Sequence, residues 1–111
     1  MSGPEAQAGS SRHPAVFRVD QDSIDATTAW DLRPVLMRAL VDAGPELTVD
    51  LSRVSFIDST GLGMLVGVLK EAREMDGDLR LVNAGREVRR VLQVTGLEAL
   101  FEQRSATVAG R

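Results

Sequence analysis

The chain has 111 residues, which is enough for one domain with its own core, and a formal net charge of −3. Apolar residues make up 43% and charged residues 26% of the chain, as in ordinary soluble proteins, and its apolar runs are too short to span a bilayer. Cysteine is absent, which excludes disulfides and thiolate chemistry, and the basic residues form no stripe suited to nucleic acid, so we expect a cytoplasmic protein without a membrane or nucleic-acid partner.

The two ends of the chain are predicted to lie outside the folded domain. Residues 1–14 are rich in Ser, Gly, Ala and Pro, and they lack the apolar stretch of a signal peptide. Residues 105–111 are too polar and too short for a secure final helix. We therefore expect a mobile N-terminal tail, a domain over residues 15–104 and a C-terminal tail.

The first predicted elements are a strand and a long helix. Val16–Asp20 is apolar and rich in β-branched residues, which favours a short strand. A helix should follow, capped by Asp25 or Thr27, whose side-chain oxygens suit the free N–H groups of a helix start. Pro34 implies either that the helix begins near it or that the helix bends there, and Gly44-Pro45 should end it. The apolar stripe of this helix comprises Ala29, Leu32, Leu36, Leu40 and Val41.

A second strand leads toward the central helix. Leu47–Leu51 alternates with period two, and residues 52–57 continue as extended, largely apolar chain. The central helix is predicted to begin at Ser59 or Thr60 and to end at residue 75, with Gly77 beyond it as a left-handed cap. Its inner stripe comprises Leu62, Leu65, Val66, Leu69 and Ala72, and its outer face Lys70, Glu71, Arg73 and Glu74.

The C-terminal part continues the alternation of strand and helix. Leu79–Asn83 predicts a strand and Arg86–Thr95 a short helix that ends at Gly96-Leu97. The inward residues of that helix would be Val88, Val91 and Leu92. Leu100 and Phe101 should pack back on the sheet. This alternation indicates an α/β domain whose mostly parallel sheet, of about four strands, is covered by helices.

The segment Asp58-Ser59-Thr60-Gly61-Leu62-Gly63 is the most informative part of the chain because it opens the central helix. A helix start carries partial positive charge on its unpaired N–H groups, so a phosphate on Ser59 or Thr60 would be tolerated while changing the surface sharply. The same residues also have plainer interpretations. Asp58 can serve only as a helix cap, and the two hydroxyl residues can be ordinary members of a first turn.

Two glycines inside the predicted central helix call for a reason. Glycine in a helix interior costs roughly 0.5 to 1 kcal/mol relative to alanine. Gly63 and Gly67 are four residues apart and share a helix face. They indicate close approach by another backbone, either the sheet beneath or a partner above, and packing within the core is the alternative.

Several catalytic and ligand sites find little support. His13, the only histidine, lies in the predicted tail, which argues against a Ser–His catalytic pair. Gly61-Leu62-Gly63 lacks the Lys-Ser/Thr pair of a Walker loop and the third glycine of a dinucleotide fingerprint. Asp22, Asp25 and Asp58 lack the spacing of a calcium loop and fit solvated caps, so we expect neither a metal nor a cofactor.

Over roughly residues 16–101 the chain resembles the STAS family, the domain of sulfate transporters and anti-sigma factor antagonists. The stretch from Val54 to Gly63 is similar, almost residue for residue, to the phosphorylation-loop motif of bacterial anti-sigma factor antagonists. Asp25-Ala26-Thr27-Thr28-Ala29 resembles the family segment in which an aspartate precedes the first helix near the phosphorylation site. Residues 88–92, followed by Thr95-Gly96-Leu97, are similar to the penultimate helix of the family and its stop.

The chain also departs from the family pattern. Asp22-Ser23-Ile24 stands where the family usually has Gly-Glu before the aspartate. A single strand replaces the usual N-terminal hairpin, and the last helix of the family is not assured. None of these departures falls within residues 54–63.

The resemblance implies a stand-alone STAS domain that acts as an anti-sigma factor antagonist, a binding protein and not an enzyme. Its implied partners are an anti-sigma factor that is also a serine kinase of the histidine-kinase-like ATPase fold, and a metal-dependent serine phosphatase. Ser59 would accept the phosphate, with Thr60 as the alternative, and Asp25 and Asp58 would orient the loop and contact the kinase. The implied partner-binding residues are Asp25, Asp58, Ser59, Thr60, Gly61, Leu62 and Gly63.

Two other classes of function remain open. One is a STAS regulatory subunit of a lipid- or anion-transport complex, in which Ser59 need not be modified. The other is a nucleotide-binding or enzymatic module, which no motif of the chain supports. The sequence does not decide between a monomer and a dimer.

Overall fold

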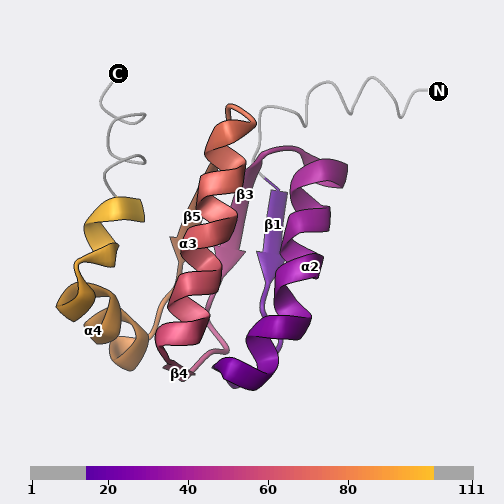
Figure 1. The fold of residues 1–111 in the computed structure, drawn as a ribbon. Coiled ribbons are helices and arrows are strands. Elements are labelled where there is room, and N and C mark those ends of the chain that lie inside the picture. The colour runs from indigo at the N-terminus through magenta and orange to yellow at the C-terminus, as the bar shows by residue number, and fades with distance from the viewer. Residues whose placement is uncertain (1–14, 102–111) are drawn as a thin grey trace.

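Figure 1 shows the computed structural model of the protein, which describes residues 15–101. The predicted tails, residues 1–14 and 105–111, and the predicted domain end at residue 104 lie outside the described residues. In chain order the elements are β1 (Ala15–Arg18), β2 (Ser23–Ile24), α2 (Ala26–Ala43), β3 (Glu46–Asp50), β4 (Phe56–Ile57), α3 (Ser59–Glu74), β5 (Asp78–Val82) and α4 (Arg86–Thr95).

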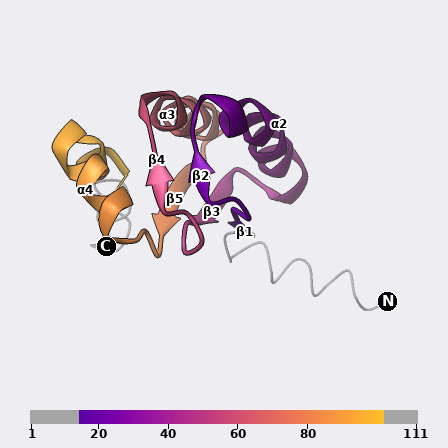
Figure 2. The same cartoon turned by 90° about the horizontal axis from the view of Figure 1, so that it is seen from below.

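The strands form a parallel sheet and a smaller parallel pair. β1, β3 and β5 pair in that order, with Phe17 opposite Val49 and Val49 opposite Leu81. β2 and β4 form a separate two-stranded pair. Helices α2 and α3 lie side by side on one face of the sheet, and α4 lies at its β5 side (Figures 1 and 2). The α/β class with a parallel sheet is confirmed, although a three-stranded sheet and a separate pair replace a sheet of about four strands.

Strand β3 keeps the period-two pattern predicted for Leu47–Leu51. Leu47, Val49 and Leu51 are almost fully buried, whereas Thr48 retains 8% exposure and Asp50 is half-buried. Residues 52–55 do not continue the strand as predicted. They form a turn in which the Val54 N–H donates to the Leu51 carbonyl, and extended pairing resumes only at β4.

Helix α2 buries the predicted stripe with one correction. Ala29, Leu32, Leu36 and Leu40 are buried. Val41 is 71% exposed, so its assignment to the core stripe was wrong; it follows Leu40 directly and therefore points about 100° away around the helix. Pro34 lies well inside α2, on its exposed side, so a helix start near Pro34 is ruled out.

Helix α3 buries a wider arc than predicted because it packs against both α2 and the sheet. Leu62, Leu65, Leu69 and Ala72 are buried as predicted. Val66 is only half-buried, whereas Met64 and Val68, which lie on neither predicted stripe, are buried.

The C-terminal end of α3 corrects two predictions. The left-handed residue is Asp76, with φ of 65°, and not Gly77. The Asp76 N–H donates to the Arg73 carbonyl and the Gly77 N–H to the Ala72 carbonyl, which closes the helix as a Schellman motif. Gly77 is needed for space, since a Cβ there would overlap the Pro45 carbonyl.

Arg73 was predicted to face water, but its side chain makes two contacts within the fold. Its Nε lies 3.4 Å from Asp78 Oδ1, and its Nη2 donates to the Leu100 carbonyl at 3.1 Å. The side chain thereby ties the end of α3 both to β5 and to the last described residues.

The C-terminal elements follow the prediction closely. Helix α4 has the predicted bounds, buries Val88 and Leu92, half-buries Val91 and ends at Gly96 in the left-handed region. Residues 97–101 are helical again. Phe101 is buried and Leu100 packs against the same core, so their predicted inward packing is confirmed. Within residues 15–101, no helix combines the length and the apolar character needed to cross a membrane.

Candidate functional site

The site begins with two aspartates that the fold brings together. β2 and β4 are parallel and in register, with Ser23 opposite Phe56 and Ile24 opposite Ile57. Asp25 and Asp58 each follow the last residue of one of these strands, and each caps a long helix. The Asp58 N–H donates to the Ile24 carbonyl at 3.2 Å. Two helix starts that are 33 positions apart in the sequence therefore lie next to each other, as seen from below in Figure 2.

Asp25 caps α2 through a dense set of hydrogen bonds. Its Oδ1 accepts from the N–H groups of Thr27 at 3.0 Å and Thr28 at 3.1 Å, and its Oδ2 accepts from the Ser23 hydroxyl at 3.2 Å. In return the Asp25 N–H donates to the Thr28 hydroxyl at 2.9 Å, which completes a capping box. The Thr28 N–H is the largest influence that lowers the pKa of Asp25 below its ordinary value, and Thr27 and Ser23 add to it. Asp25 is thus held as a carboxylate at the helix start.

Asp58 caps α3 and sets the position of the hydroxyl residues. Its Oδ1 accepts from the Gly61 N–H at 2.9 Å, and its carbonyl accepts from the Leu62 N–H at 2.9 Å. The helix can start this close to β2 only because position 61 is glycine, since a Cβ there would overlap the Ile24 carbonyl. The plain interpretation of Asp58 as a helix cap is confirmed.

Ser59 and Thr60 occupy the first two helical positions of α3, and both side chains are exposed. Within the described part of the chain neither hydroxyl has a hydrogen-bond partner. Their own N–H groups belong to the first turn, which has no carbonyl partners within the helix and carries partial positive charge. The arrangement offers two accessible nucleophilic hydroxyls at a position that accommodates an anion.

Of the three residues after the hydroxyls, only one offers an exposed surface. Gly61 is buried under Ile24, and Leu62 is 5% exposed and belongs to the core. The expectation that both would present a docking surface is therefore not met in this structure. Gly63 is exposed.

The two interior glycines of α3 do not serve packing within the domain. Among residues 15–101, nothing lies within 4 Å of a Cβ built at Gly63 or Gly67. The predicted approach of the sheet beneath these positions is therefore wrong, and so is the alternative of core packing, because the glycine that makes such a contact is Gly61.

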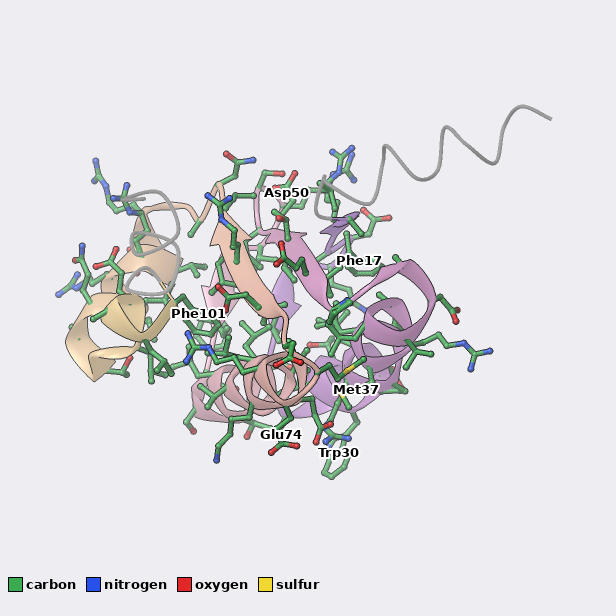
Figure 3. All side chains as sticks on the ribbon, turned by 90° about the horizontal axis from the view of Figure 1, so that it is seen from above. Phe17, Trp30, Met37, Asp50, Glu74 and Phe101 are labelled. Carbon is green, nitrogen blue, oxygen red and sulfur yellow. The ribbon has the colours of Figure 1, made fainter. Side chains whose placement is uncertain are left out.

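Two exposed aromatic residues near the site were missed by sequence reasoning. Trp30 on α2 is 75% exposed and Phe56 on β4, two residues before Asp58, is 52% exposed. Figure 3 shows Trp30 extending from α2 away from the sheet. The helical pattern contained a signal for Trp30, because it follows the core residue Ala29 directly and so falls off the buried stripe.

The described residues contain no group of three or more acidic or histidine side chains that could hold a metal ion. Asp22 takes part in the site through its backbone, since its carbonyl accepts from the N–H of Ser55 at 2.8 Å. The three aspartates considered as cation ligands thus act as two helix caps and one strand connection in this structure.

Comparison with known proteins identifies the class to which this fold and site belong. A family model described as STAS domain matches residues 6–110. The chain therefore belongs to the STAS domain family.

Two of the similar proteins are anti-sigma-B factor antagonists of bacteria. An anti-sigma-B factor antagonist of Listeria monocytogenes is 38% identical over 79 residues, 71% of this chain and 69% of the relative. The protein of the same name from Staphylococcus aureus is 33% identical over 84 residues, 76% of this chain and 78% of the relative.

Two solved structures of SpoIIAA are also similar to this chain. The anti-sigma factor antagonist SpoIIAA in its unphosphorylated form is similar with a TM-score of 0.66 and 26% identity, over 86% of this chain and 88% of the other. The phosphorylated form of SpoIIAA, described as a Bacillus cell fate determinant, is similar with a TM-score of 0.58 and 26% identity, over 75% of each chain.

Proposed function

We propose that this protein is an anti-sigma factor antagonist controlled by phosphorylation of Ser59. Its unmodified form binds an anti-sigma factor that is also a serine kinase of the histidine-kinase-like ATPase fold, and thereby frees a sigma factor for transcription. Phosphorylation of Ser59 releases the anti-sigma factor, and a metal-dependent serine phosphatase restores the binding form. The protein acts by binding and not by catalysis.

The observation that carries this proposal is the exposed hydroxyl pair in the first turn of α3, next to the capped start of α2. Ser59 is accessible to a kinase, and its backbone is held by the Asp58 cap and by the fit of Gly61 under Ile24. Relatives named anti-sigma-B factor antagonists support the assignment of the partner class. Thr60 is the alternative acceptor, since it is also exposed and lies one position further into the helix.

The chemistry of the switch follows from local charge. A phosphoserine adds about −1.5 to −2 charge at neutral pH. At position 59 that charge stands next to the carboxylate of Asp58 and close to that of Asp25, which the parallel pairing of β2 and β4 places alongside. In the free protein the N–H groups of the first turn offset part of the repulsion. In the complex the bulk and charge of the phosphate fall on the docking surface itself.

The fold is expected to survive the modification. The hydroxyl of Ser59 has no hydrogen-bond partner among residues 15–101, so modification breaks no contact there. The similarity of this chain to both the unphosphorylated and the phosphorylated structures of SpoIIAA supports a switch that acts at the surface. A loss of affinity of roughly 5- to 150-fold is the usual range for such coupling.

The test starts with affinity capture from native lysate and identification of the captured proteins by mass spectrometry. The purified anti-sigma kinase is then titrated calorimetrically with the unmodified chain, with Ser59→Asp and with the enzymatically phosphorylated chain. We expect the phosphorylated chain to bind at least about 5-fold more weakly, with an unchanged circular dichroism spectrum. Equal affinities for all three would refute the proposal, and capture of a transporter ATPase in place of a kinase would favour the transport-complex alternative.

A matched pair of variants assigns the acceptor. Ser59→Ala and Thr60→Ala each remove one hydroxyl from adjacent exposed positions of the same helix turn, so each should change the free energy of unfolding by no more than about 1 kcal/mol. After incubation with the kinase and ATP, Thr60→Ala should be phosphorylated and Ser59→Ala should not. Phosphate found on Ser59→Ala at Thr60 would move the acceptor to that residue.

A further inference from the structure

Trp30 is the most conspicuous exposed apolar side chain beside the proposed switch. It is the only tryptophan of the chain and 75% of it is exposed, although tryptophan is usually well buried in folded proteins. It contributes little to the core, since the buried residues of α2 next to it are Ala29 and Leu32. A side chain of this size buries about 150 to 250 Å² when it is covered, so its exposure leaves a large apolar surface in water.

Trp30 forms one side of a surface pocket that reaches the switch. The pocket has a volume of about 350 Å³ and is lined by Ala29, Trp30, Arg33, Thr60 and Met64. Ala29 and Met64 are buried residues of α2 and α3, so they form an apolar floor between the two helices. Thr60, from the exposed hydroxyl pair, belongs to the same lining.

We propose that this pocket, with Trp30 as its anchor, receives an apolar side chain of the anti-sigma kinase. The inference rests on the proposed function, and it adds a second contact point outside the loop that carries Ser59. Continuity of surface selects this occupant, because a kinase that reaches the Ser59 hydroxyl must also cover Thr60, and Thr60 lines the pocket.

Charge adds to the argument. Arg33 also lines the pocket, is exposed and forms no ion pair with any residue of the described part of the chain. If the partner carries a carboxylate next to the apolar side chain that enters the pocket, that carboxylate can therefore pair with Arg33. Trp30 is exposed in the free chain and would be covered in the complex, and tryptophan and arginine are enriched among the residues that dominate binding energy in protein interfaces.

The test uses a pair of variants on the same face of α2. Val41 lies three turns, or about 16 Å, beyond Trp30 on the same helix face. Val41 is 71% exposed and does not line the pocket, so it matches Trp30 in character but not in position. We expect Trp30→Ala to weaken binding of the purified anti-sigma kinase by about 30-fold or more, as at interface anchors, and Val41→Ala to change it less than about 2-fold.

The tryptophan also provides a direct probe of the pocket. Incorporation of 5-fluorotryptophan gives the chain a single fluorine resonance, because Trp30 is its only tryptophan. Addition of the kinase should shift this resonance in the unmodified chain and much less in the phosphorylated chain. A shift that grows with the concentration of the chain alone would instead assign the pocket to a second copy of the protein and overturn the proposal.

The outcomes separate this inference from the proposed function. One decisive result is that Trp30→Ala binds the kinase as tightly as the chain without substitutions does, while Ser59→Asp binds it weakly. That result would overturn the role of the pocket and leave the phosphorylation switch intact. Equal losses for Trp30→Ala and Val41→Ala would also overturn it, because the effect would not be local. If the unmodified chain does not bind the kinase at all, both proposals fall.

Discussion

Substitution of Gly63 by alanine should stabilise the fold and weaken partner binding at the same time. Gly63 lies in the interior of α3, and a Cβ built there has no atom of the described residues within 4 Å. Alanine in a helix interior is favoured over glycine by roughly 0.5 to 1 kcal/mol, and no steric cost opposes that gain here. For a domain of this size, that gain corresponds to a rise in melting temperature of roughly 2 to 8 °C.

Two further glycines of α3 supply the controls. Gly67→Ala has the same open surroundings one turn further along, so it should stabilise the fold by a similar amount. Gly61→Ala should act in the opposite direction, because its Cβ would overlap the backbone carbonyl of Ile24, and overpacking of this kind typically costs about 1 to 3 kcal/mol. All three changes add one methyl group to one helix, so the sign of the effect reports only the surroundings.

Thermal unfolding by circular dichroism and calorimetric titration with the anti-sigma kinase measure the two effects. We expect Gly63→Ala to melt higher and to bind more weakly, because a methyl group would stand on the exposed face next to Ser59. A lower melting temperature for Gly63→Ala would refute the inference that this face is open. A higher melting temperature with unchanged affinity would show that the partner does not contact position 63.

The remaining predictions concern the core and the first cap. Leu65→Ala should lower the free energy of unfolding by about 2 to 5 kcal/mol because Leu65 is fully buried, whereas Val66→Ala should cost less than about 2 kcal/mol because Val66 is half-buried. Urea denaturation compares the two, and equal losses would contradict the packing described here. The pKa of Asp25 is lowered from its ordinary value of 3.8, so its carboxylate stabilises the fold above that pH, and this contribution is lost as the pH falls through the lowered pKa. Asp25→Asn keeps a capping oxygen that does not titrate, so the difference in free energy of unfolding between this variant and the chain with Asp25 should shrink below about pH 4. A difference that stays constant from about pH 6 to about pH 2 would argue against the charged cap.

The extent to which the structure follows from the sequence depends on the range of the forces involved. The bounds of α4, the buried stripe of α2 except for Val41, and the cap Asp58 were predicted, and Asp25 was one of two predicted caps of α2, because apolar periodicity and capping act within a few residues. The two-residue strand β2 was not predicted, since it exists only through its pairing with β4, 33 positions away.

The glycines show the same limit within the site. Gly61, Gly63 and Gly67 occur in one helix, yet one fills a tight contact and two face open space. Only the location of Ile24 distinguishes them, and that location follows from the fold as a whole. Trp30 and Met64 likewise form a pocket with Thr60 because α2 and α3 pack side by side, which no local pattern reports.

The bond from the Asp58 N–H to the Ile24 carbonyl has a consequence for the kinetics of recognition. Together with the bond from the Gly61 N–H to Asp58, it fixes the backbone on both sides of Ser59 and Thr60. The amides of Asp58 and Gly61 should therefore exchange with solvent deuterium slowly, while those of Ser59 and Thr60 exchange fast. A partner thus meets a segment that is already shaped, and little chain entropy is lost when it docks. Differences in affinity among variants of this surface should accordingly arise in the dissociation rate more than in the association rate.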